Sequence, residues 1–201
     1  MRRLALVLLA VCLALGLASQ VETQAKPVAE ANAVDEPNRI LGPPIYTQAD
    51  VERYASSVGC TRYILKAIPI YYKLAPHINI RPDVLVAQAV LETNRGHYGG
   101  DSMPWNMAGI KKDGAVRDRP KDFEVVPNAS EGVRMHVNHM AAYTGKRAVG
   151  TPHDRYYEAR AAQSRREWWV RKVSQLGNGV WASDPDYASK IQRILDDMGK
   201  R

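Results

Sequence analysis

Residues 81–95 run Arg-Pro-Asp-Val-Leu-Val-Ala-Gln-Ala-Val-Leu-Glu-Thr-Asn-Arg, and this stretch decides how the chain folds. Pro82 and Asp83 suit the first turn of a helix, because proline needs no amide partner there and an acid is stabilised by the helix dipole. From 84 to 91 the residues are apolar on nearly every side apart from Gln88. A helix of this kind is buried on most of its faces. The segment therefore predicts a central helix that other elements surround.

The segments on either side carry patterns typical of amphipathic helices. Thr47 and Asp50 form a helix start, and Gly59 is a plausible end. Apolar residues recur every three or four positions through residues 61–75, where Pro69 should bend or divide the helix. Further helices are expected over residues 128–143, 164–175 and 185–198, and a small β hairpin within residues 115–126. The predicted fold class is mainly α with this hairpin.

The N-terminal stretch differs from the rest of the chain. Two arginines precede residues 4–18, an apolar run that has no charge and is short for a membrane span. This pattern predicts a secretory signal peptide over residues 1–25, and the alternative is an uncleaved membrane anchor. Residues 26–44 show no periodicity and are predicted to be a flexible tether. One folded domain is then expected over residues 45–201.

Net charge and cysteine content narrow the class of protein. Of the 201 residues, 45% are apolar and 24% are charged, which is an ordinary globular composition. The formal net charge of +7 favours contact with anionic polymers. Nucleic acid is such a polymer, but an exported protein would not meet it, so no nucleic-acid partner is expected. Removal of the signal peptide leaves Cys60 as the single cysteine, for which a buried, inert thiol is expected.

Glu92 stands out because it closes a helix with almost no polar face. A carboxyl group in apolar surroundings resists ionisation, since its charged form loses hydration. The negative end of the helix dipole acts in the same direction. Both effects keep a proton on Glu92 toward neutral pH, which is the property that a general acid needs. The alternative is a solvated glutamate near a helix end.

The residues after Glu92 combine glycines with aromatic rings. Gly96, Gly99 and Gly100 flank His97 and Tyr98, and residues 105–111 follow as Trp-Asn-Met-Ala-Gly-Ile-Lys. Flat rings can stack on sugar faces, and glycines let a chain approach closely. The segment therefore favours a sugar-binding groove, and the alternative is a loop with ordinary core aromatics.

Four segments, in order, carry a resemblance to a known family. They are Ala-Gln-Ala-Val-Leu-Glu-Thr at 87–93, Asn-Met-Ala-Gly-Ile-Lys at 106–111, Ser-Glu-Gly at 130–132 and Trp-Ala-Ser-Asp-Pro-Asp-Tyr at 181–187. Together they resemble the glucosaminidase domain of glycoside hydrolase family 73, over about residues 45–198. The resemblance implies a lysozyme-like α+β fold, mainly helical, in which the hairpin flanks a substrate groove.

The same resemblance assigns roles to residues. Glu92 would be the catalytic acid, Asn106 would lie near the bond that is cut, and Tyr187 would line the groove from the last helix. The alternatives are that Asn106 caps a turn and that Tyr187 is a core tyrosine. The other side chains expected to bind sugars, or else simply to pack, are Tyr98, Trp105 and Trp181.

The resemblance also implies an activity and a location. It predicts an endo-β-N-acetylglucosaminidase that cleaves β-1,4 bonds in the glycan strands of peptidoglycan, secreted or associated with the cell wall. We expect a monomer that also meets anionic wall polymers. The alternatives are a muramidase or a lytic transglycosylase acting on the same polymer, or a wall-binding module without activity.

The second catalytic group is not assigned by any motif. A pair of carboxylates must lie about 5–9.5 Å apart, and the hairpin segment offers Asp113, Asp118, Asp122 and Glu124. The alternative is assistance from the 2-acetamido group of the substrate.

The histidines do not form a metal motif. His136 and His139 are three residues apart and His153 lies further along, without the spacing of a zinc site. No metal and no cofactor are expected.

Overall fold

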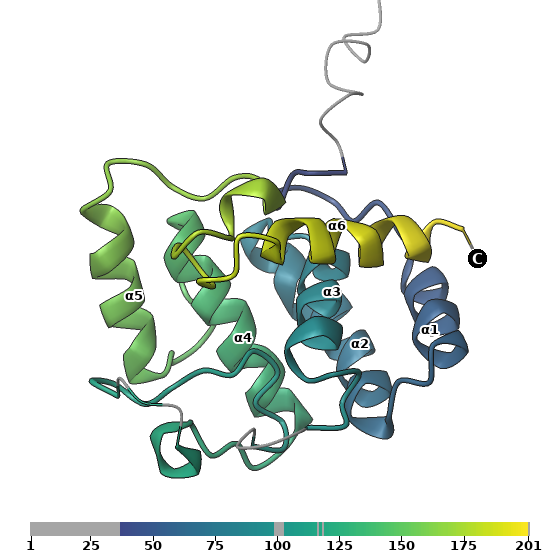
Figure 1. Cartoon of the computed structure of the whole chain (residues 1–201), viewed down its shortest axis with the longest axis horizontal. Helices are drawn as coiled ribbons and strands as arrows, with labels where there is room; N and C mark the ends of the chain where they lie inside the picture. The colour runs from purple at the N-terminus through teal and green to yellow at the C-terminus, as the bar shows by residue number, and fades with distance from the viewer. Residues whose placement is uncertain (1–36, 99–102, 116, 118, 201) are drawn as a thin grey trace, which may run out of the picture. The chain divides into compact units, whose positions relative to one another are not determined.

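The computed structural model describes residues 37–98, 103–115, 117 and 119–200. In this part of the chain, six α-helices and three short 3-10 helices form the fold (Figure 1). The α-helices are α1 (Gln48–Ser57), α2 (Arg62–Leu74), α3 (Pro82–Glu92), α4 (Ala129–Thr144), α5 (Asp154–Ser164) and α6 (Tyr187–Met198). The 3-10 helices are η1 (Ala75–Ile78), η2 (Pro120–Asp122) and η3 (Val173–Gln175). The mainly α prediction is confirmed.

Helix α3 is the centre of the domain, as its sequence predicts. Each residue from 82 to 90 is buried. Helices α1, α2 and α6 all contact α3, while α4 packs on α2 and α5 packs on α4. Figure 1 shows α6 passing over α3, so the last helix of the chain lies beside the end of the central one. No helix of the described residues is long and apolar enough to cross a membrane.

Residues 37–44 pack against the domain, which corrects the C-terminal part of the predicted tether. Ile40 is fully buried in the core. Arg81 donates from its guanidinium to the carbonyl of Arg39 at 2.9 Å and forms a buried ion pair of 2.7 Å with Asp83. These long-range bonds order a segment that has no helical or strand periodicity of its own. The predicted signal peptide and residues 26–36 of the tether lie outside the described residues.

The predicted hairpin does not form as a pair of strands in the described part of residues 110–126. One isolated antiparallel bridge joins Lys111 to Phe123. Beyond that bridge the chain turns through η2, where Arg119 forms an ion pair of 2.9 Å with Asp122. Pro120 has no amide hydrogen to donate to a partner strand, so the pairing ends there.

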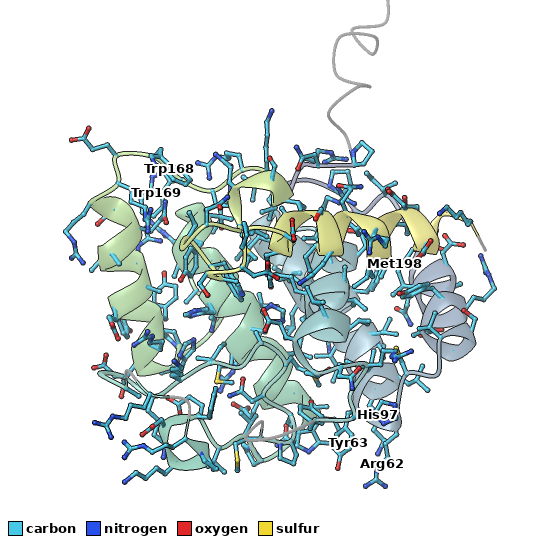
Figure 2. All side chains as sticks on the ribbon, viewed as in Figure 1. Arg62, Tyr63, His97, Trp168, Trp169 and Met198 are labelled. Atoms are coloured by element: carbon cyan, nitrogen blue, oxygen red, sulfur yellow. The ribbon has the colours of Figure 1, made fainter. Side chains whose placement is uncertain are left out.

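The helix predicted over residues 164–175 is wrong. Helix α5 ends at Ser164, and the chain then reverses at Glu167, whose φ is +62°. The ring of Trp169 lies so close to Gly145 that a Cβ atom at this glycine would be 2.7 Å from the ring. Figure 2 shows Trp168 and Trp169 together beside the end of α5. Packing of a tryptophan on α4 thus outweighs the helical pattern of this segment.

Candidate functional site

Glu92 is the last residue of α3 and is partly buried. Its Oε1 atom accepts a hydrogen bond of 2.5 Å from the hydroxyl of Tyr187, the first residue of α6. The same oxygen accepts a bond of 3.2 Å from the indole nitrogen of Trp181. The packing of α6 on α3 thus brings together three residues that the sequence predicted for the site.

The surroundings of Glu92 raise the pKa of its carboxyl group. Burial is the largest cause, because the ionised form loses hydration. The hydrogen bonds from Tyr187 and Trp181 act in the opposite direction, because they stabilise the ionised form. The net direction is upward, so Glu92 holds its proton to higher pH than an exposed glutamate does. The carboxylate that remains after proton loss still has two donors.

The two oxygens of Glu92 differ. Oε1 has both donors, whereas Oε2 has no hydrogen-bond partner among the described residues. Oε2 is not one of the side-chain atoms that are both fully buried and unpartnered, so it retains contact with solvent. Glu92 therefore has one oxygen held by two protein donors and one that has no hydrogen-bond partner among the described residues.

A chain of buried polar groups continues inward from Tyr187. Gln88, one turn before Glu92, donates from Nε2 to the Tyr187 hydroxyl at 3.1 Å. His136 on α4 lies 3.3 Å from the Gln88 Oε1 atom through its Nε2 atom. The Nδ1 atom of His136 is 2.6 Å from the hydroxyl of Tyr71 on α2. Sequence reasoning missed these three residues, although a single glutamine in an apolar helix was a signal that a buried partner exists.

Trp181 also lines a small pocket next to this cluster. Its ring packs edge-on against His139 at 5.0 Å between centroids, and lies tilted by 48° against the ring of Tyr143 at 5.1 Å. The pocket has a volume of about 180 Å³. Its lining residues are Ala108, Gly109, Ile110, Lys111, His139, Tyr143, Arg155 and Trp181. A continuous groove along the cluster, as the sequence predicted, is not shown by the described residues.

Asn106 is buried and holds its own loop together. Its amide donates to the carbonyl of Ile110 at 2.8 Å and accepts from the amide of Ile110 at 2.8 Å. It also donates to the carbonyl of Glu124 at 3.3 Å. These bonds match the alternative in which Asn106 caps a turn, and a role in binding stays a prediction.

Tyr98 and Trp105 form an aromatic cluster with Tyr63, and no hydrogen bond joins either of them to Glu92. The ring of Tyr63 meets Tyr98 at 5.2 Å and Trp105 at 4.6 Å, both edge-on. Figure 2 labels Tyr63, from α2, and His97, from the segment after α3. A Cβ atom at Gly132 would lie 2.0 Å from the carbonyl oxygen of Trp105. This close approach explains the glycine of the Ser-Glu-Gly segment at the start of α4.

The candidate second carboxylates differ in their surroundings. Asp122 is engaged by Arg119, whose hydrogen bond lowers the pKa of the Asp122 carboxyl. Asp113 is exposed, and Asp118 lies outside the described residues. Glu124 is half-buried, and burial raises the pKa of its carboxyl. Of the three that the structure describes, Glu124 is therefore the one that combines burial with an elevated pKa.

His136, His139 and Cys60 are buried, and His153 is partly buried. Burial lowers the pKa of His136 to about 3 and that of His153 to about 4, and it also lowers that of His139. Burial raises the pKa of the Cys60 thiol to about 11, as expected for an inert thiol. No three histidine, cysteine or acidic side chains of the described chain gather as a metal site would require.

A carboxyl group whose pKa is raised by burial, as at Glu92, is the kind of general acid that glycan-cleaving enzymes use. Comparison with known families agrees with this class. The glucosaminidase family, described as mannosyl-glycoprotein endo-beta-N-acetylglucosaminidase, matches residues 68–200, and the chain belongs to this family. The resemblance inferred from the four segments is confirmed. Searches of curated proteins and of solved structures found no match.

Proposed function

We propose that the domain is an endo-β-N-acetylglucosaminidase that cleaves β-1,4 bonds in peptidoglycan strands, with Glu92 as general acid. The observation that carries the proposal is the asymmetry of the Glu92 carboxyl. Oε1 is held by two donors, whereas Oε2 has no hydrogen-bond partner among the described residues and is not among the fully buried unpaired atoms. Membership of the glucosaminidase family supports the class of reaction.

In the proposed reaction, Oε2 of Glu92 gives its proton to the glycosidic oxygen as the bond from that oxygen to the sugar C1 breaks. Tyr187 and Trp181 then stabilise the Glu92 carboxylate through the bonds to Oε1. Water adds at C1 and loses a proton, which returns the acid to its starting form. The group that assists at C1 is either Glu124 or the 2-acetamido group of the substrate.

The choice of peptidoglycan rests on charge and on the predicted export. The net charge of +7 favours an anionic polymer over a neutral glycan. Lys111 and Arg155 both line the pocket beside Trp181, where a carboxylate of a muramoyl peptide would meet positive charge. We propose that the protein is secreted or wall-associated, that it also contacts anionic wall polymers, and that it acts as a monomer. An uncleaved N-terminal anchor is the alternative.

The test compares wild type with Glu92→Gln on purified cell-wall sacculi. The expected result is loss of at least about a hundredfold in rate, because general acid catalysis contributes on that scale. Glu52→Gln is the matched control, because Glu52 lies on α1 and bonds only to Gln48 among the described side chains. Equal rates for wild type and Glu92→Gln would refute the acid assignment.

Mass spectrometry of the products separates the alternative activities. A reducing N-acetylglucosamine end supports the proposal, a reducing muramic acid end indicates a muramidase, and an anhydro sugar indicates a transglycosylase. If wild type releases no fragments but sediments with the sacculi, the domain is a wall-binding module.

A further inference from the structure

The chain of hydrogen-bonded groups behind Tyr187 runs through Gln88 and His136 and ends at the hydroxyl of Tyr71. This hydroxyl is called the closed end of the chain. Tyr71 is fully buried, and its hydroxyl contacts one hydrogen-bonding partner among the described residues, the Nδ1 atom of His136. A hydroxyl that is buried without an acceptor for its hydrogen is costly. The Tyr71 hydroxyl must therefore donate to Nδ1, which leaves that ring nitrogen without a hydrogen.

This first bond determines the direction of the others. The ring of His136 is neutral, because burial depresses its pKa, so its single N–H must be on Nε2. Nε2 therefore donates to the Oε1 atom of Gln88 at 3.3 Å. The amide group of Gln88 then donates to the oxygen of Tyr187 at 3.1 Å. The remaining direction for the Tyr187 hydrogen is toward Oε1 of Glu92, at 2.5 Å.

The opposite set of donor and acceptor roles is disfavoured, because the Tyr71 hydroxyl at the closed end would have no acceptor. In that arrangement Glu92 would carry its proton on Oε1 and donate it to Tyr187, which would donate to Gln88. His136 would then carry its hydrogen on Nδ1 and donate to Tyr71. The Tyr71 hydrogen would point into the apolar core without an acceptor, which costs free energy.

We propose that Tyr71, His136 and Gln88 are positioning residues that keep the proton of Glu92 on Oε2. They act through Tyr187, because a hydroxyl that always donates to Oε1 prevents that oxygen from carrying the acidic proton. The inference rests on the proposed function of Glu92 as general acid. Its consequence is that every protonated Glu92 presents the proton on the solvent-accessible oxygen, where a glycosidic bond can receive it.

The most direct test uses the wild-type chain and needs no substitution. Two-bond correlations between ring protons and nitrogens in ¹⁵N-labelled protein report which nitrogen of a histidine carries the hydrogen. The expected result is the Nε2–H form of His136 throughout the pH range of activity. The Nδ1–H form, or a doubly protonated ring, overturns the proposal.

The second test removes the closed end of the chain. Tyr71→Phe deletes the hydroxyl that sets the direction. Nδ1 of His136 is then unpaired in both arrangements, as an acceptor in one and as a donor in the other, so the preference for one direction is weakened. The matched control is Tyr72→Phe on the same helix, because that hydroxyl donates to the carbonyl of Tyr46 at 2.5 Å and takes no part in the chain. We expect kcat to fall about threefold to tenfold in Tyr71→Phe alone, as for residues that act through another, with KM unchanged.

A kcat for Tyr71→Phe equal to that of Tyr72→Phe overturns the proposal, as does a change confined to KM. Failure of the proposed function has a separate signature, because Glu92→Gln would then remain active. In that case the tautomer of His136 in the wild-type protein still decides the direction of the chain.

Discussion

Replacement of Tyr187 by phenylalanine tests how the site sets the pKa of Glu92. The substitution removes the hydroxyl that donates to Oε1 at 2.5 Å, which is the larger of the two influences that lower this pKa. A hydrogen bond to a charged group contributes about 1.5–3 kcal/mol. The protonated acid keeps this bond at about 0.5–1.5 kcal/mol, so only the difference shifts the pKa. Since one pKa unit corresponds to about 1.4 kcal/mol, the pKa of Glu92 should rise by about one unit. Trp181 would remain as the single donor.

The change in pKa has a defined sign in activity and in stability. A general acid works in its protonated form, so activity is lost as pH rises through the pKa of Glu92. The alkaline limb of the kcat profile should therefore move to higher pH in Tyr187→Phe. A carboxyl whose pKa is higher in the folded than in the unfolded state adds stability at low pH. This contribution is fully present below the pKa of the unfolded state, and it is lost as the pH rises through the pKa of the folded state. Above that range the variant should be less stable than wild type.

The assay is a titration of the Glu92 carboxyl by NMR in protein labelled with ¹³C at the glutamate side chains, with the resonance assigned through Glu92→Gln. Tyr143→Phe is the control, because Tyr143 packs on Trp181 at 5.1 Å but has no hydrogen bond to Glu92 among the described residues. An unchanged or lower Glu92 pKa in Tyr187→Phe, or an equal rise in Tyr143→Phe, would refute the reasoning.

Three further predictions concern the loop, the N-terminal segment and the second carboxylate. Asn106→Ala should lower the free energy of unfolding by about 2–4 kcal/mol in urea titrations, because it leaves buried backbone groups of the loop unpaired; a loss below 1 kcal/mol would contradict this role. Asp83→Ala should cost about 3–5 kcal/mol in thermal unfolding, since it leaves the buried Arg81 guanidinium without its carboxylate; a variant as stable as wild type would show that the pair is dispensable. Glu124→Gln should lower kcat about a hundredfold if this carboxyl assists at C1, while exposed Asp113→Asn should not; full activity of Glu124→Gln would favour assistance by the substrate.

The candidate site was predicted only in part. The predicted residues lie in recognisable sequence segments, whereas the others are joined only by contacts between distant helices. Glu92, Tyr187 and Trp181 belong to segments that the family resemblance picks out, and the structure places their polar atoms within hydrogen-bond distance. Tyr71 and His136 lie in helices whose sequence patterns indicate only a buried face. Their hydrogen bond spans 65 positions of the chain, and no periodicity of either helix encodes such a contact.

The sequence alone determined the class of the fold and the position of most helices. Helices α1 to α4 begin and end near the predicted boundaries, because caps and apolar spacing act between residues a few positions apart. Tertiary structure decided the remainder. Residues 37–44 are ordered by Arg81, Trp169 packs on Gly145 where a helix was expected, and the hairpin stops at one bridge. In the first two cases the deciding contact joins residues far apart in the chain, and its energy appears only when the helices have packed. The hairpin is ended by the local turn at Pro120.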